Sequence, residues 1–353
     1  MQTEAAVLSE LNKPLRLLTL TTPDLKPGQV LVEVAYSGVC HSQLLEVHGK
    51  RGLDRFLPHT LGHEGSGTII EVGAGVTKVK PGDRVVLSWI KGRGADVPST
   101  IYRSVDETVN SGAISTFMRH TVTCENRVTP ITDTMPLREA ALLGCAIPTG
   151  VGIILNASRV EASSSVAVFG TGGIGLSVVL GASLVNAAKI IAVDVFEHKL
   201  EQARQVGATH LINANQQDPL AAILEISGGT GVDYAIEAAG QRQTMETAFR
   251  SVRDNGGLCV LAGNLPHGEC ISLDPFDLIK GKRIIGTWGG ETQPDRDIPM
   301  YVDFYLAGKL KSDGLITHTY GLMDVNHALC DLENGKVSRA LIDMNQPIGR
   351  GER

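Results

Sequence analysis

Residues 166–194 have the sequence VAVFGTGGIGLSVVLGASLVNAAKIIAVD, the most informative segment of the chain. It opens on four apolar residues, 166–169, a run short and β-favouring enough to predict a buried strand. The next residues have the spacing G-x-G-x-x-G and precede a proline-free apolar run that predicts a helix. Its glycines are Gly170, Gly172, Gly173 and Gly175. A second apolar run follows and ends at Asp194, 19 residues beyond Gly175.

A glycine-rich turn between a strand and a helix, with an acidic residue at this distance, is typical of a dinucleotide site. The glycines permit a sharp turn, close approach of a pyrophosphate and close helix–strand packing, while the helix N-terminus offers N–H groups to the phosphates. Asp194 would accept hydrogen bonds from the adenosine ribose, which favours NAD(H) over NADP. The alternative is a glycine-rich turn in a flavodoxin-like sheet that binds no dinucleotide. Strands alternate with helices beyond Asp194, which predicts a doubly wound parallel α/β sheet.

Length and composition narrow the class of protein. A chain of 353 residues has room for about two domains. Its net charge of −6 offers no basic surface for nucleic acid, and no apolar run reaches the ~18 residues of a membrane span. The N-terminus lacks the apolar core of a secretory signal. Six scattered cysteines show no disulfide-scaffold spacing, which predicts a reducing, cytoplasmic setting.

The first 90 residues predict short strands and tight turns. Alternating or apolar runs at 30–34, 67–73 and 82–87 are typical of a small antiparallel barrel. From 91 to 113 the pattern fails, and four glycines and prolines in a polar segment predict a long loop.

Three cysteine and histidine motifs lie outside the glycine-rich stretch: GVCHS at 38–42, GHEG at 62–65 and GCAIPTG at 144–150. Two thiolates and one imidazole bind Zn²⁺ tetrahedrally with one position open, which is the arrangement of a catalytic zinc. Taken singly, each residue is more often an inert core cysteine or an ordinary polar histidine.

In this order, and beside this nucleotide-binding stretch, the motifs resemble the zinc-dependent medium-chain alcohol dehydrogenases over nearly the whole chain. The segments VGAGV at 72–76 and KPGDRV at 80–85 carry the same resemblance. It implies a GroES-like β-barrel catalytic domain interrupted by an NAD-binding Rossmann domain. The expected segments are 1–155 for the catalytic domain, 156–290 for the Rossmann domain, and 291–353 for the return to the catalytic domain.

The resemblance also assigns roles to single residues. One catalytic Zn²⁺ per subunit would be held by Cys40, His63 and Cys145, with Glu64 as a nearby acid able to ligate it transiently. Ser42 would bind the substrate oxygen and begin the proton relay. The cofactor contacts would be His41, Thr149, Lys199 and Arg339, and Trp89 would form a wall of the substrate pocket. Lys199 and Arg339 could instead be solvated charges, and Trp89 a core residue.

Three departures from the family pattern stand out. Residues 88–112 contain no cysteine and no histidine, so no structural zinc is expected there. Gln43 stands where an aspartate commonly orients the zinc-bound histidine; its amide could accept an imidazole N–H but brings no charge. Leu45 occupies the usual relay-histidine position, so a proton would pass from the ribose hydroxyl to water or through His48.

The sequence therefore predicts an oxidoreductase that transfers a hydride between NAD(H) and a small-molecule alcohol or carbonyl. Lys91, Arg93 and Arg103 would favour a polar or anionic alcohol, such as a sugar- or cyclitol-like one, if they reach the pocket mouth, and are otherwise solvated loop charges. The alternatives are a zinc-free quinone or enone reductase and a non-catalytic nucleotide-binding protein on the same fold. The resemblance implies a homodimer or homotetramer, with no nucleic-acid or membrane partner.

Overall fold

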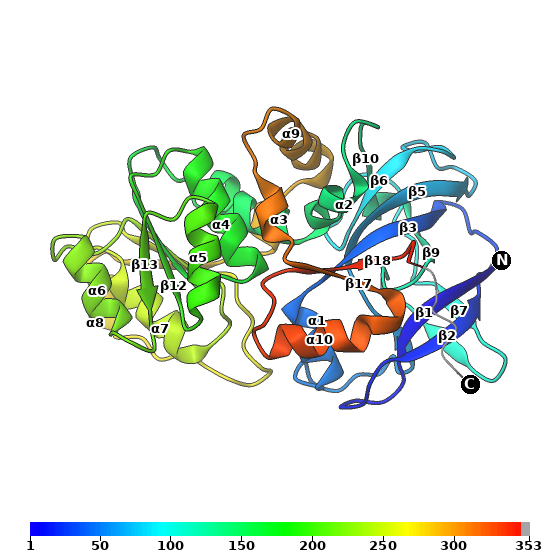
Figure 1. Ribbon diagram of the computed structural model, residues 1–353, viewed down its shortest axis with the longest axis horizontal. Helices are drawn as coiled ribbons and strands as arrows, with labels where there is room; N and C mark the ends of the chain where they lie inside the picture. The colour runs from blue at the N-terminus through cyan, green and yellow to red at the C-terminus, as the bar shows by residue number, and fades with distance from the viewer. Residues whose placement is uncertain (347–353) are drawn as a thin grey trace. The chain divides into compact units, whose positions relative to one another are not determined.

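A computed structural model describes residues 1–346, and the chain divides into two compact units (Figure 1). Unit 1 contains Met1–Cys145, Gln293–Leu306 and the described residues from Ile316 onward, and unit 2 contains Ala146–Thr292 and Ala307–Leu315. The predicted domain boundaries at 155/156 and 290/291 stay a proposal. Residues 347–353 of the predicted third segment lie outside the described residues.

Unit 2 is built on a six-stranded sheet in the order β13-β12-β11-β14-β15-β16, in which every neighbouring pair is parallel. The predicted doubly wound sheet is confirmed, and its order is that of a Rossmann fold. In chain order the strands are β11 Ser165–Phe169, β12 Lys189–Asp194, β13 His210–Asn213, β14 Tyr234–Glu237, β15 Leu258–Leu261 and β16 Arg283–Gly286. β11 is apolar throughout its middle because neighbours cover both of its edges and helices cover its faces.

Helices flank this sheet in two pairs (Figure 1). Helix α4 (Gly173–Leu184) packs on β11, β12 and α5, and helix α6 (Pro219–Ile226) packs on β13 and α7. The other helices of the unit are α3 Ala146–Gly152, which continues into a π-helical turn Ile153–Ala157, α5 Glu197–Gln205, α7 Arg242–Ser251 and α8 Pro275–Ile279. A local signal begins α6, since Asp218 accepts from the Leu220 N–H and Pro219 occupies the first turn.

Unit 1 combines a closed five-stranded barrel with a seven-stranded sheet. The barrel contains β1 Gln2–Leu8, β2 Arg16–Thr21, β7 Ile101–Arg103, β8 Thr108–Asn110 and β4 His59–Thr60. The sheet contains β10 Val128–Pro130, β6 Arg84–Ser88, β5 Glu64–Val72, β3 Gln29–Val39, β18 Ala340–Asp343, β17 His318–Gly321 and β9 His120–Cys124. The returning C-terminal strand β18 pairs antiparallel with β3, which supports the expected β-rich, GroES-like architecture.

In the part of unit 1 that the structure describes, the α-helices are α1 His41–Val47, α2 Leu137–Ala140, α9 Pro294–Leu306 and α10 Val325–Glu333. α10 packs against α1 and β3, and its apolar face joins a core of alternate residues from the sheet, such as Val30, Val32 and Val34. This period of two places the apolar side chains of β3 on one face. Among the described residues, no single helix is both long and apolar enough to cross a membrane.

The segment 91–113 is not the featureless loop that the sequence predicts. It contains the antiparallel pair β7 and β8, which closes the barrel against β2 and β4. Each strand has only three residues, too few for a period-two pattern to emerge. Tyr102 of β7 is fully buried, and its hydroxyl accepts a hydrogen bond from the Val122 N–H at 2.7 Å.

Candidate metal centre and cofactor site

Unit 1 brings Cys40, His63 and Cys145 together although they are far apart in sequence. One ligand-type atom from each lies within 4.8 Å of those of the other two. Cys40 and Cys145 are 7% and 5% exposed, and His63 is half-buried. Over residues 1–346 this is the one such group of three or more metal-binding side chains.

Local structure explains how each of the three is presented. Cys40 is the N-cap of α1, in extended conformation. His63 lies between Gly62, whose φ of +89° is unfavourable for other residues, and the start of β5. Cys145 lies between a 3₁₀ turn, Ala141–Gly144, and α3. The Ser88 hydroxyl donates to the Gly144 carbonyl at 2.7 Å and so ties the Cys145 turn to β6.

The chemistry of this donor set suits zinc. Hydrogen bonding to Cys145 holds the pKa of Cys40 well below its ordinary value; burial opposes this, and His63 adds to it. Two buried thiols and an imidazole at this spacing are a set that Zn²⁺ binds with one position left open. The three residues therefore fit a catalytic zinc.

Gln43 is completely buried behind His63. Its Oε1 accepts from the Cys40 backbone N–H at 2.6 Å, and its Nε2 lies 2.8 Å from His63 Nδ1. The sequence predicted a contact with His63 through the acceptor of the amide. The structure places the donor there instead, because the Cys40 N–H takes the oxygen.

Glu64 and Arg339 form a buried ion pair: the Arg339 Nη2 contacts Glu64 Oε1, and both side chains are almost inaccessible. Glu64 is not among the three clustered ligands. Its role as a transient ligand, and that of Arg339 as a phosphate contact, stay predictions. Glu64 is held close to β3, since a Cβ added at Gly38 would lie 2.0 Å from its Oε1.

The remaining predicted residues of unit 1 are on or beside α1. His41 is exposed, and the Ser42 hydroxyl lies 3.5 Å from His63 Nδ1. His48 follows the helix, with Nε2 at 2.9 Å from Glu333 of α10 and Nδ1 at 3.3 Å from Asn12. Trp89 is partly buried against the main core of the unit. Ser42 thus lies beside a clustered ligand, and the roles of His41, His48 and Trp89 stay predictions.

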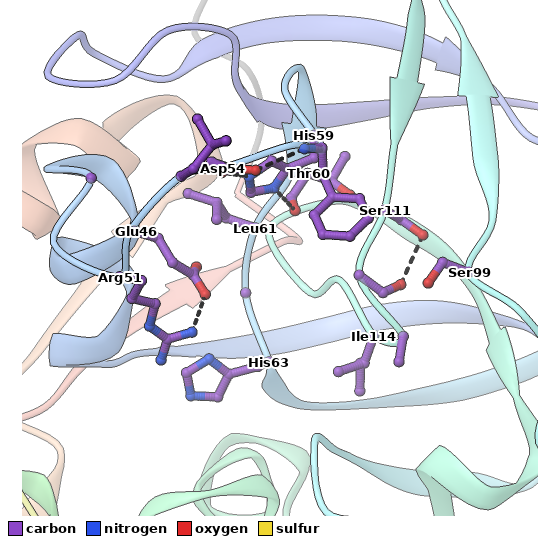
Figure 2. Close-up of a pocket in the computed structure, with 17 residues that line it drawn as sticks. Glu46, Arg51, Asp54, His59, Thr60, Leu61, His63, Ser99, Ser111 and Ile114 are labelled. Carbon is purple, nitrogen blue, oxygen red and sulfur yellow. Dashed lines mark hydrogen bonds and ion pairs between the residues drawn. The ribbon is translucent and has the colours of Figure 1, made fainter. Parts of the chain in front are cut away.

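A pocket of about 480 Å³ opens beside His63, which lines it (Figure 2). Two ion pairs lie in its wall: Arg51 with Glu46 at 2.6 Å, and His59 with Asp54 at 2.8 Å. Hydroxyls of Thr60, Ser99 and Ser111 also line it. Lys91, Arg93 and Arg103 are not among the lining residues. Sequence reasoning missed this wall because Glu46, Arg51 and Asp54 belong to no motif.

In unit 2 the glycine turn lets α4 pack closely against β11. A Cβ added at Gly175 would lie 1.8 Å from the Gly170 carbonyl oxygen, so α4 approaches β11 as only glycine permits. Asp194 ends β12; its Oδ2 accepts from the Thr171 N–H and hydroxyl at 2.7 and 2.9 Å. This contact ties the acidic residue to the glycine turn.

Two further predicted cofactor residues lie in unit 2. Burial lowers the pKa of Lys199, although Asp194 opposes this, and the Lys199 Nζ lies 4.9 Å from the centre of the Phe196 ring. Thr149 is buried in α3, and its hydroxyl has no hydrogen-bond partner among the described residues. A buried hydroxyl without a partner is costly, so Thr149 suits contact with a bound group.

Comparison with known proteins agrees with this geometry. Residues 26–133 match the model of the alcohol dehydrogenase GroES-like domain, and residues 173–307 match that of the zinc-binding dehydrogenases. The chain is 33% identical to an S-(hydroxymethyl)glutathione dehydrogenase of Synechocystis, covering 97% of this chain and 100% of the relative. It is 32% identical to that of Paracoccus denitrificans, with the same coverage.

Solved structures give the same result. The crystal structure of benzyl alcohol dehydrogenase from Acinetobacter calcoaceticus matches with a TM-score of 0.89 and 32% identity, covering 97% of this chain and 99% of that one. An alcohol dehydrogenase zinc-binding domain protein from Burkholderia ambifaria matches with a TM-score of 0.90 and 30% identity, covering 98% and 100%. The chain belongs to the zinc-containing alcohol dehydrogenases of the medium-chain dehydrogenase/reductase family. It is a zinc-dependent oxidoreductase of the alcohol dehydrogenase class.

Proposed function

We propose that this enzyme uses one catalytic zinc per chain, held by Cys40, His63 and Cys145, to transfer a hydride between a polar alcohol and NAD. The observation that carries the proposal is the convergence of these three donors beside a pocket that His63 itself lines. Zinc bound there would supply a Lewis acid that makes an alcohol hydroxyl more acidic. The two thiolates balance its two charges.

Ser42 is proposed to take the alcohol proton, because its hydroxyl is placed beside His63. Beyond Ser42, the contacts of His48 with Glu333 and Asn12 favour direct passage to water over the His48 route. His48→Ala should then leave the rate and the pH profile unchanged. A loss of rate would restore His48 to the relay.

NAD(H) is the proposed cofactor, bound over Gly170, Gly172, Gly173 and Gly175. The Asp194 carboxylate at the end of β12 would repel the phosphate of NADP. His41, Thr149, Lys199 and Arg339 remain its proposed further contacts, and no structural zinc is proposed. The six free cysteines support a reducing, cytoplasmic setting.

A polar substrate is favoured by the pocket wall. Its hydroxyls and two ion pairs offer several hydrogen-bond partners, and an exposed pair such as Arg51–Glu46 costs little to open. Relatives of this chain act on S-(hydroxymethyl)glutathione and on benzyl alcohol, as their names state. The former is polar and charged, and it fits this wall better than the latter.

A homo-oligomer is proposed because one edge of the unit 2 sheet is open. β16 is the last strand in the sheet order, and three of its four residues are exposed or nearly so, including Ile285 at 38%. Uncovered sheet edges favour pairing with another strand. Light scattering should give at least twice the chain mass, and Ile285→Lys should reduce it.

One experiment tests the proposal against its alternatives. Zinc per chain would be measured, together with NAD and NADP reduction by S-(hydroxymethyl)glutathione, a polyol and benzyl alcohol, before and after chelation. Zinc near one per chain and chelator-sensitive NAD reduction with a polar alcohol support it. Metal-independent reduction of quinones or enones would favour a zinc-free reductase. Absence of turnover with every alcohol would favour a non-catalytic nucleotide-binding protein.

A further inference from the structure

The hydrogen bonds of Gln43 determine which end of its amide faces His63. A backbone N–H can only donate, so the Gln43 atom that lies 2.6 Å from the Cys40 N–H is the oxygen. The amide nitrogen is therefore the atom 2.8 Å from His63 Nδ1. An amide NH₂ only donates, so Nδ1 must be the acceptor.

This contact selects one tautomer of His63. A neutral imidazole carries its proton on one nitrogen and a lone pair on the other. With Nδ1 accepting from Gln43, the proton lies on Nε2, the other ring nitrogen and the one left to bind a metal with the neighbouring thiols of Cys40 and Cys145. A metal ligand needs a lone pair at that atom. The Ser42 hydroxyl, at 3.5 Å from Nδ1, can donate or accept and does not change this.

We infer that Gln43 is a positioning residue that holds His63 in the tautomer opposed to zinc binding, so that loading the metal requires the amide to turn over. The His63 proton must move from Nε2 to Nδ1, and Gln43 Oε1 must rotate to accept it. The Gln43 NH₂ would then face the Cys40 N–H, and two hydrogen-bond donors cannot bond to each other. The hydrogen bond from the Cys40 N–H to Gln43 Oε1, which caps the N-terminus of α1, is therefore lost.

A carboxylate at this position would meet no such conflict. It would accept from the Cys40 N–H with one oxygen and from the His63 Nδ1–H with the other, in both the free and the loaded state. Gln43→Glu replaces only the NH₂ by an oxygen and keeps the side-chain length. This inference rests on the proposed zinc site and adds that Gln43 lowers the affinity of that site for Zn²⁺.

The matched control is Gln29, another buried glutamine of unit 1. It is 2% exposed, accepts from the Lys26 N–H at 2.9 Å and donates to Thr100 at 3.2 Å. Gln29→Glu therefore adds a buried carboxylate at a residue outside the cluster. Gln43→Asp serves as a second carboxylate variant in case Gln43→Glu does not fold.

The first measurement is Zn²⁺ affinity by competition with a chromophoric chelator. Gln43→Glu, and Gln43→Asp in the same direction, should bind Zn²⁺ about 10–100-fold more tightly than the wild type, while Gln29→Glu should not differ. Equal affinities for the wild type and both Gln43 variants would overturn the inference and leave the proposed function intact.

The second measurement is ¹⁵N NMR of histidine-labelled, metal-free protein. The His63 proton should lie on Nε2 in the wild type and on Nδ1 in Gln43→Glu. On zinc loading, the Cys40 amide should exchange faster with solvent only in the wild type. A wild-type Nδ1–H tautomer would overturn the inference even if affinity rises, because charge alone would then explain the rise. If neither the wild type nor the variants bind Zn²⁺, the proposed zinc site is wrong. The His63 tautomer measured by NMR then still tests whether Gln43 positions His63.

Discussion

The ligand cluster and the segment 88–112 are two regions of unit 1 that the chain stabilises in different ways. The cluster gathers two thiols and an imidazole within 4.8 Å of one another. The segment contains no cysteine and no histidine, and hydrogen bonds to carboxylates and carbonyls hold it instead. Residue types alone suggest the metal site, whereas they do not reveal hydrogen bonds of the kind that hold the segment 88–112.

Glu125 is the main anchor of the segment. It is 3% exposed; its Oε1 accepts from the Thr77 and Lys78 N–H groups at 2.6 and 2.7 Å, and its Oε2 accepts from the Ala95 N–H at 3.0 Å. Asp295, at the start of α9, adds contacts to the Arg93 N–H and the Lys78 ammonium. One carboxylate thus joins two loops, so a shared metal is not needed for that purpose.

The largest difference between the two regions should appear in activity. Cys145→Ser removes one thiolate from the cluster, and we expect loss of bound zinc and about a 10³-fold drop in kcat/KM, since metal activation supplies several kcal/mol. Metal analysis and steady-state kinetics measure it. Cys124→Ser is the control, because this buried cysteine contacts Asn126 rather than the cluster. Full zinc content in Cys145→Ser would contradict the assignment.

Removing the carboxylate anchor should affect stability rather than metal content. Glu125→Gln keeps the volume but places an NH₂ among N–H donors, and we expect it to lower the free energy of unfolding by about 1–3 kcal/mol. Urea titration measures it, with zinc per chain unchanged. Glu107→Gln, which opens the surface pair with Arg16, should cost less. Loss of zinc from Glu125→Gln would show that the two regions are coupled.

The contribution of Glu125 to stability should also depend on pH. Burial raises the pKa of Glu125, but the hydrogen bonds from Thr77, Ala95 and Lys78 outweigh it and hold that pKa below its ordinary value. The stabilisation is therefore complete above the unfolded pKa of about 4.3 and is lost as pH falls through the lower folded pKa. Below about pH 5, the free energy of unfolding should therefore fall more steeply with decreasing pH in the wild type than in Glu125→Gln. An equal pH dependence in the two proteins would exclude this contribution of Glu125.

The smallest effect is expected at the surface of the same segment. Lys91 and Asp96 form an ion pair in which both side chains are more than half exposed. Solvent screens such pairs, so Lys91→Ala should not measurably change the melting temperature or the kinetics with polar alcohols. A selective loss with an anionic alcohol would instead support the earlier hypothesis that these cations reach the substrate.

Much of this protein could be predicted from particular residues. The glycines and Asp194 act through neighbours in the same strand–turn–helix unit, so a contiguous stretch was sufficient to predict the Rossmann sheet. Strands β7 and β8 were not predicted, because a strand of three residues is too short to show an alternating pattern of apolar and polar residues. The wall of the pocket escaped it because Arg51, Glu46 and Asp54 are ordinary surface residue types.

Residue types and local spacings were sufficient to indicate the kinds of donor available and the family to which the chain belongs, because both are properties of the chain alone. The three-dimensional fold was needed to show that Cys40, His63 and Cys145 meet, that Glu125 joins two loops, and that Gln43 presents its donor to His63. These contacts are directional. A hydrogen bond depends on which atom faces which, and that depends on contacts such as the Cys40 N–H that no sequence spacing expresses.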